Sequence, residues 1–202
     1  MDMYIFFDVE ATSGNPKDGD IVEIAMKTDP KTCKQERSFQ SVKSGITKKR
    51  LIDPNINEFK VVYKNMMKWL KNRVQKAREW YKKRDISKDV RPVLCAHGGF
   101  KFDFEIFIRN VERYVGYFYE MKYLHLAFAD TFLLCQELQQ KDLPELQDTA
   151  RLGMDGLYSL FYAGEKFPDR HRAMGDVNAM SKILGDKLWE HLPQLRILTY
   201  KS

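Results

Sequence analysis

The sequence predicts a single α/β domain in which helices cover a mixed sheet of about five strands. Alternating apolar segments near the N-terminus, separated by short turn-forming stretches, indicate strands that pair antiparallel. Farther along the chain, short apolar runs alternate with segments of helical period, which is typical of strands joined by helices. The 202 residues, 44% of them hydrophobic, suffice for one core, and no linker-like tract divides residues 1–202.

The first half is expected to form three strands, a long helix and a fourth strand. We predict the three strands at 3–9, 21–28 and 35–43, with the turn-forming stretch ATSGNPKDGD after the first. Between about 56 and 83, apolar residues recur every three or four positions, which predicts a helix. The run PVLCAH at 92–97 is almost wholly apolar, as expected for a strand covered on both faces.

The second half continues the alternation of helices and strands. A glycine turn precedes a helix predicted from about 104 to 115, and a fifth strand is predicted at 126–131. Shorter helices are expected around 143–152 and 157–163. A final helix is predicted from about 174 to 191.

The positive charge is concentrated in one segment. Residues 60–91 contain twelve Lys and Arg against three acidic residues, whereas the net charge of the whole chain is only +6. A basic segment on a slightly acidic body would attract a polyanion such as nucleic acid. The alternative is an ordinary solvated helix face.

The cysteine pattern and the lengths of the apolar runs predict the cellular compartment of the protein. Cys33, Cys95 and Cys135 are an odd number without C-x-x-C spacing, so we expect a reducing compartment and no zinc site. The N-terminus lacks the pattern of a signal peptide, and no apolar run approaches the roughly 20 residues that span a bilayer. We therefore expect a soluble protein of the cytoplasm, the nucleus or both, not secreted and with no membrane partner.

Two acids stand where an apolar strand ends, in the stretch FFDVEAT. Residues two apart on a strand point to the same side, so Asp8 and Glu10 present both carboxylates to one place. Two adjacent anions repel each other unless a cation or proton lies between them. Chance is the alternative, because the pattern also occurs at Asp103 and Glu105.

Three further residues could complete a site. Asp103 is expected at the start of a helix, where it could equally be an ordinary charge at a helix N-terminus. His171 and Asp176 are five residues apart, which on one helix would turn them about 140° from each other. We therefore place His171 on the loop before the last helix, although an isolated histidine is by default a capping or surface residue.

Taken together, these residues predict a metal-dependent hydrolase. Asp8, Glu10, Asp103 and Asp176 form an all-oxygen ligand set suited to Mg²⁺ or Mn²⁺. Two such divalent ions support phosphodiester hydrolysis by in-line displacement. His171, whose side chain ionises near neutral pH, would take the proton from the attacking water.

Three segments resemble the motifs of the DEDDh 3′ to 5′ exonucleases, which have a ribonuclease H-like fold. They are FDVEAT, AHGGFKFDFEIF and HRAMGDV. His171 matches the histidine form of the third motif, whereas the sister group has a tyrosine at the position of Arg172. Within the family, FFDVEATS, DIVEIAM, DTFLLCQEL and LYSLFYAGEKFPDRHRAMGDVNAMSKIL resemble the three-prime repair exonuclease (TREX) type.

The resemblance assigns a role to each motif residue. It implies that the four carboxylates bind metal and that His171 is the general base. It also implies that Ala11, Thr12 and Phe102 contact the terminal nucleotide. The chain departs from the family pattern at Gly98, where Asn is common, and at Met174, where an acid is common.

The predicted activity is removal of 5′-mononucleotides from the 3′ end of DNA, preferably single-stranded. The resemblance also implies a homodimer. An RNA exonuclease of the same class remains an alternative, because the site acts on phosphate. A nucleic-acid-binding module without hydrolysis and a non-catalytic protein that binds an acidic partner are further alternatives.

Overall fold

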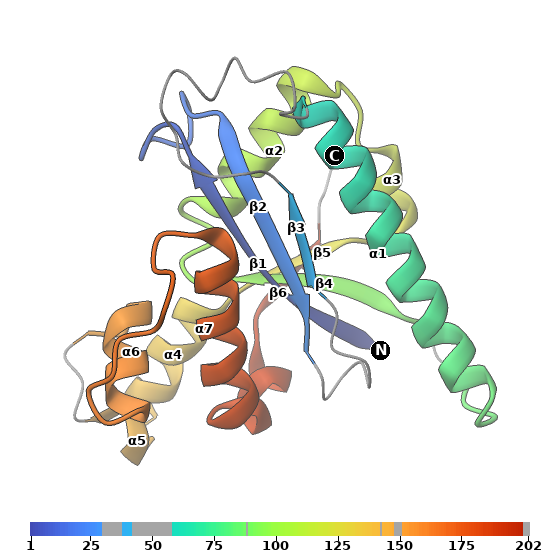
Figure 1. Ribbon diagram of the computed structural model, residues 1–202. Helices are drawn as coiled ribbons and strands as arrows, with labels where there is room; N and C mark the ends of the chain where they lie inside the picture. Colours follow the sequence, from blue (N-terminus) through green and yellow to red (C-terminus); the bar gives the residue numbers. More distant parts are fainter. Residues whose placement is uncertain (30–37, 42–57, 88, 142, 148–150, 200–202) are drawn as a thin grey trace.

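A computed structural model describes most of the chain (Figure 1). The described residues are 1–29, 38–41, 58–87, 89–141, 143–147 and 151–199. Within them, the chain forms one mixed sheet with helices on both faces. The strands are β1 (Asp2–Ala11), β2 (Ile21–Thr28), β3 (Ser38–Ser41), β4 (Arg91–Ala96), β5 (Ala127–Asp130) and β6 (Ile197–Thr199).

The strand order is β3-β2-β1-β4-β5-β6. β1 pairs antiparallel with β2 and parallel with β4, and β4 pairs parallel with β5. The carboxyl ends of β1, β4 and β5 therefore meet at the same edge of the sheet. The register of β1 and β2 sets Glu10 opposite Glu23, and a bulge follows Glu10.

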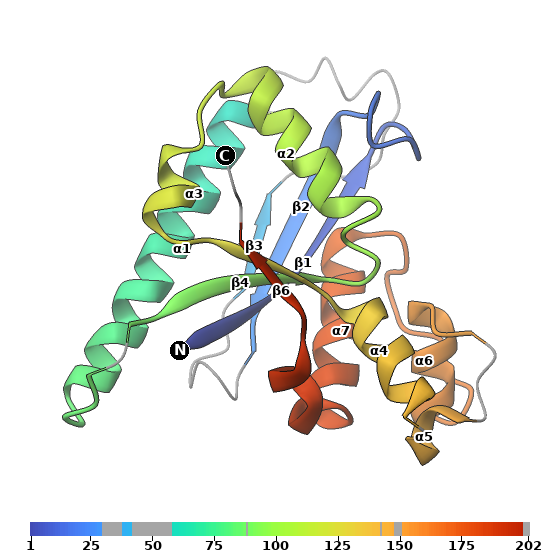
Figure 2. The ribbon, with the colours of Figure 1, turned by 180° about the vertical axis from the view of Figure 1, so that it is seen from behind.

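Two helical layers cover the sheet (Figures 1 and 2). One layer contains α1 (Phe59–Lys82), α2 (Asp103–Tyr114) and α3 (Tyr119–Tyr123). The other contains α4 (Thr131–Gln140), α5 (Pro144–Gln147), α6 (Met154–Phe161), α7 (Ala173–Asp186) and the 3₁₀ helix η1 (Trp189–Gln194). No helix in the described ranges combines the length and apolarity needed to cross a membrane.

The alternation of β1 divides its side chains between two cores. Ile5 and Phe7 belong to the cluster that includes α1 and α2 residues, and Tyr4 and Phe6 belong to the cluster that includes α7 residues. All four are buried. Because the even-numbered residues face α7, the acids that continue this face also lie on the α7 side.

The structure confirms the α/β class and the predicted order of strands and long helices. The described residues form six strands instead of the expected five, because β6 is only three residues long and shows no clear period. The last helix is shorter than expected, since the chain leaves helical conformation near Leu188 and resumes as η1. Parts of the predicted elements at 35–43, 56–83 and 143–152 lie outside the described residues.

Candidate metal site

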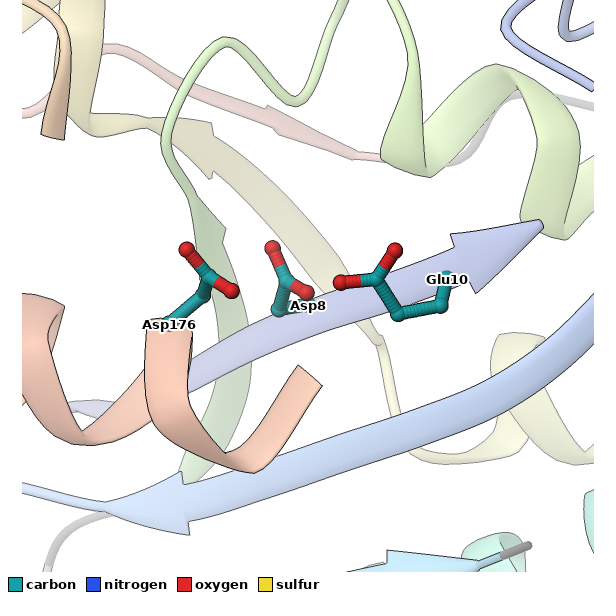
Figure 3. A group of neighbouring side chains, drawn as sticks. All are labelled: Asp8, Glu10 and Asp176. Atoms are coloured by element: carbon teal, nitrogen blue, oxygen red, sulfur yellow. The ribbon is translucent and has the colours of Figure 1, made fainter. Parts of the chain in front are cut away.

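Three carboxylates from distant parts of the sequence converge at the edge of the sheet (Figure 3). Asp8 and Glu10 extend from β1, and Asp176 extends from the first turn of α7. One oxygen of each carboxylate lies within 4.8 Å of the other two. The predicted grouping of Asp8, Glu10 and Asp176 is thus present as a geometric cluster.

These three residues supply the oxygen ligands that a hard divalent cation prefers. Oxygen ligands on opposite sides of a Mg²⁺ ion lie roughly 4.2 Å apart, since each bond is about 2.1 Å. The oxygens of the cluster lie within 4.8 Å of one another, so only small side-chain rotations would bring all three to one ion. In addition, Oδ2 of Asp176 is buried and has no hydrogen-bond partner among the described residues. A buried anion oxygen without a partner is costly, and a bound cation would remove that cost.

Burial raises the pKa of each clustered carboxyl, and repulsion from other carboxylates of the cluster adds to this for Asp8 and Glu10. For Asp8, loss of solvation has the largest effect and the charges of Asp103 and Asp176 come next, so its pKa lies well above the usual range. Desolvation also raises the pKa values of Glu10 and Asp176. The cluster therefore holds either protons or a compensating cation.

Asp103 lies next to this cluster and is held by the backbone of β1. It is the first residue of α2, and its Oδ1 accepts a hydrogen bond from the N–H of Val9 at 3.2 Å. Its side chain is buried, and desolvation raises its pKa to about 7 despite this hydrogen bond. Asp103 is not one of the three residues whose carboxylate oxygens lie within 4.8 Å of one another. Among the neighbouring carboxylates, however, it contributes most to the raised pKa of Asp8.

Asp130 fixes the loop that leads into Asp103. Its carboxylate accepts hydrogen bonds from the backbone N–H groups of Gly98 at 2.9 Å and Phe100 at 3.1 Å. It also accepts one from Phe132, which caps α4. Gly98 has φ +81°, a conformation that glycine adopts without strain and that Asn tolerates better than most residues. Glycine at position 98 thus suits this loop.

His171 lies on the loop before α7, as expected from its spacing to Asp176. It is exposed and adopts φ +59°, while Asp169 in the same loop adopts φ +55°. The positive charge of His171 lowers the pKa values of both Glu10 and Asp176, which places the imidazole at the border of the carboxylate cluster. The loop also packs closely on α7, because a Cβ on Gly175 would clash with the carbonyl oxygen of Asp169.

The sequence did not single out one ion pair beside the cluster. Glu23 on β2 is 0% exposed and lies opposite Glu10, and its Oε2 is 3.2 Å from Nε of Arg172. Arg172 directly follows His171 and is the N-cap residue of α7. The signal available in the sequence was an acid inside the apolar strand segment DIVEIAM, where a buried carboxylate requires a partner.

The three residues expected at the terminal nucleotide occupy different environments. Ala11 is half-buried at the end of β1, after the bulge. Thr12 is exposed, and its Oγ1 accepts a hydrogen bond from the N–H of Asp20 at 3.0 Å. Phe102 is half-buried immediately before Asp103 and packs against the core that includes α2. Ala11 and Phe102 thus adjoin the carboxylates in sequence.

Comparison with solved structures places this arrangement in a known class of fold. The chain has the ribonuclease H-like α/β fold, and similar solved structures include a cell-death related nuclease and exonuclease I. Cell-death related nuclease 4 (CRN-4) matches with a TM-score of 0.57 and 12% identity, over 98% of this chain and 66% of that one. Exonuclease I matches with a TM-score of 0.57 and 12% identity, over 96% of this chain and 43% of that one.

A zinc-bound complex of E. coli exonuclease I with single-stranded DNA is also similar. Its TM-score is 0.58 and its identity is 13%, over 96% of this chain and 42% of that one. The present chain therefore spans less than half of exonuclease I and just under two thirds of the nuclease 4 chain. No protein-family model matches the sequence, and comparison with the curated proteins gave no match.

Proposed function

We propose that the protein is a 3′ to 5′ exonuclease of the DEDDh class that uses two Mg²⁺ or Mn²⁺ ions. The observation that carries this proposal is the convergence of Asp8, Glu10 and Asp176, with Asp103 beside them, on a fold shared with exonucleases. The TREX-like motifs of the sequence support DNA as the substrate, preferably single-stranded. The products would be 5′-mononucleotides.

Each residue has a role that follows from its position. Asp8, Glu10, Asp103 and Asp176 would hold the ions, which lower the pKa of water and stabilise the leaving oxygen when bound. His171, at the exposed border of the cluster, would accept the proton of the attacking water. Its loop position leaves the ring accessible to solvent, so the proton can pass on to bulk water.

The residues beside the carboxylates would position the 3′ end. Phe102 offers an aromatic ring at the entrance to α2, and stacking on a base requires no particular base identity. Ala11 and Thr12 follow Glu10 directly, where a terminal nucleotide bound to the ions would contact them. This arrangement supports removal of any terminal nucleotide, as an exonuclease requires.

RNA is the alternative substrate, because the carboxylates and ions act on phosphate and do not sense the 2′-hydroxyl. A single assay separates the possibilities. Matched DNA and RNA oligonucleotides, labelled at either the 3′ or the 5′ end, are incubated with Mg²⁺, Mn²⁺ or EDTA. We expect metal-dependent release of mononucleotides from 3′-labelled DNA, and a ladder that shortens from the 3′ side when the label is at the 5′ end.

Variants complete the assay. Asp8→Asn should abolish hydrolysis, whereas Glu190→Gln, which removes an exposed charge on η1, should leave turnover unchanged. If Asp8→Asn retained the activity of the unaltered protein, the assignment of the site would be wrong. Metal-dependent binding of oligonucleotides without any cleavage would instead favour a nucleic-acid-binding module.

A further inference from the structure

A stripe of lysines runs along one side of α1. With about 100° of rotation per residue, five lysines fall within a sector of roughly 80°. They are Lys60, Lys64, Lys68, Lys71 and Lys82, which we call the lysine stripe. The opposite side of α1 contributes Tyr63, Met66, Leu70 and other buried residues to the core.

Most of the lysine stripe lacks charge compensation in the described part of the chain. Among the described residues, Lys60, Lys64, Lys68 and Lys82 have no carboxylate within ion-pair distance, and all four are exposed. In contrast, Arg78 pairs with Asp89 at 2.7 Å. The stripe is therefore a region of net positive potential on the surface.

Two exposed tyrosines lie beside this stripe. Lys71 contacts Glu120 at 3.7 Å, so α3 packs alongside α1, as Figures 1 and 2 also show. On α3, Tyr119 is 71% exposed and Tyr123 is 62% exposed. Their ring centroids are 6.4 Å apart and the ring planes differ by only 23°. Two nearly parallel rings thus face solvent on the helix that contacts the lysine stripe at Lys71.

α2 runs from the residue beside the carboxylate cluster to the start of α1. α2 begins at Asp103 and ends at Tyr114, a length of roughly 18 Å at 1.5 Å per residue. Tyr114 contacts Phe59, with ring centroids 6.0 Å apart, and Phe59 directly precedes Lys60. With about 3.4 Å per stacked nucleotide, a strand of roughly five or six nucleotides would cover the length of α2.

We propose that the lysine stripe, together with Tyr119 and Tyr123, binds an unpaired nucleic-acid strand upstream of its 3′ end. The lysines would contact phosphates, and the tyrosine rings would stack on bases. Stacking of this kind requires bases whose faces are free, so the surface selects single strands over duplexes. This inference rests on the proposed nuclease function, which supplies the strand and its polarity.

Binding without hydrolysis tests the surface independently of catalysis. Fluorescence anisotropy in EDTA is measured with a 20-nucleotide single strand and with its duplex. Tyr119→Ala/Tyr123→Ala should weaken single-strand binding about tenfold or more, and the corresponding double Phe variant should retain it, since phenylalanine also stacks. Lys64→Ala/Lys68→Ala should lower the slope of log K against log salt by about 1.4.

A matched control keeps the charge change but moves it to another surface. Lys141→Ala/Lys187→Ala removes two exposed lysines at the ends of α4 and α7, outside the proposed face, and should leave the affinity and its salt slope nearly unchanged. Equal binding of duplex and single strand, with no effect of the tyrosine changes, would overturn the proposal. So would equally tight binding of poly-glutamate, which would indicate an acidic protein partner.

Steady-state kinetics locate the surface relative to the 3′ end. For the 20-nucleotide strand, the tyrosine and lysine variants should raise KM about tenfold with little change in kcat. For a trinucleotide, which cannot reach α3 from the carboxylates, KM should not change. A protein that binds single strands as described but never cleaves them would contradict the nuclease assignment alone, whereas cleavage with unaltered KM in every variant would contradict this surface alone.

Discussion

Arg172, the residue directly after His171, forms an ion pair with the buried carboxylate of Glu23. Nε of Arg172 lies 3.2 Å from Oε2 of Glu23. Glu23 is 0% exposed, while the Arg172 side chain is 45% exposed. The pair therefore ties the loop of His171 to β2, immediately beside Glu10. The guanidinium charge of Arg172 also lowers the pKa of Glu10, so the pair favours the ionised form that a metal ligand would require.

This relationship predicts the effect of Arg172→Gln. We expect kcat to fall about tenfold or more because the loop of His171 loses its anchor, while KM changes less. Stability should fall by about 1–3 kcal/mol, since Glu23 loses a charged partner. Combining Arg172→Gln with Glu23→Gln should recover stability without recovering kcat, and Arg172→Lys should recover part of kcat. Kinetics and urea unfolding measure both quantities; equal recovery of kcat and stability would argue for a purely structural role.

The raised carboxyl pKa values predict how the stability of the metal-free protein depends on pH. Asp8, Glu10, Asp103 and Asp176 all bind protons more tightly when folded than their ordinary values near 4 imply. Their contribution to stability is thus largest at low pH and is lost as pH rises toward about 7, the value for Asp103. The loss per pH unit is at most about 1.4 kcal/mol for each proton released.

Thermal unfolding in EDTA between pH 4.5 and 8 tests that dependence. We expect Tm to fall as pH rises, and Mg²⁺ to restore it most strongly at the high end, where the carboxylates are ionised. Asp8→Asn should flatten the profile. A Tm that rises with pH in EDTA for the unaltered protein, and falls for Asp8→Asn, would be inconsistent with the electrostatic account of the cluster.

Asp176→Asn should separate stability from activity. The change removes one of three mutually repelling charges, so the metal-free protein should be more stable at pH 8 by about 1 kcal/mol or more. The same change removes a proposed ligand, so the Tm increase caused by Mg²⁺ should shrink and hydrolysis should be lost. Asp186→Asn, which changes an acid at the other end of α7, serves as the control and should preserve the Mg²⁺ response.

His171 offers a test in which folding is not at risk. The side chain is exposed, so His171→Ala should leave thermal stability nearly unchanged apart from the cost of its positive φ, and His171→Asn accommodates that backbone conformation better. Both should lower kcat by about 10² to 10⁴, the range for loss of a general base. Rates that increase with pH in these variants, through hydroxide attack, would distinguish loss of the base from loss of metal binding.

Local patterns in the sequence were sufficient for much of the fold and for the outline of the site. The two-residue spacing of Asp8 and Glu10 on a strand guaranteed a common face, and the five-residue spacing of His171 and Asp176 excluded a shared helix face. Both relations depend on neighbouring residues along the chain. The roles assigned to these residues remain predictions.

Sequence periodicity could not predict the contacts between segments that lie far apart along the chain. Glu23 and Arg172 are 149 residues apart, and their pairing depends on how α7 lies across β1 and β2. The apposition of α1 and α3 likewise arises from packing. β6 was missed because three residues carry too little period-two signal, and α4 was missed because its start merges with β5 at Asp130 and Thr131.

The carboxylate of Asp130 holds the loop before Asp103. The site can therefore be completed only after this later part of the chain has been synthesised. Asp103 itself is held by Val9 of β1, but the loop before it gains its hydrogen bonds to Asp130 only when β5 has emerged, and Asp176 arrives later still, with α7. A ribosome therefore exposes β1 and its two acids long before their partners exist. For the function proposed above, hydrolysis would become possible only once nearly the whole domain has been made.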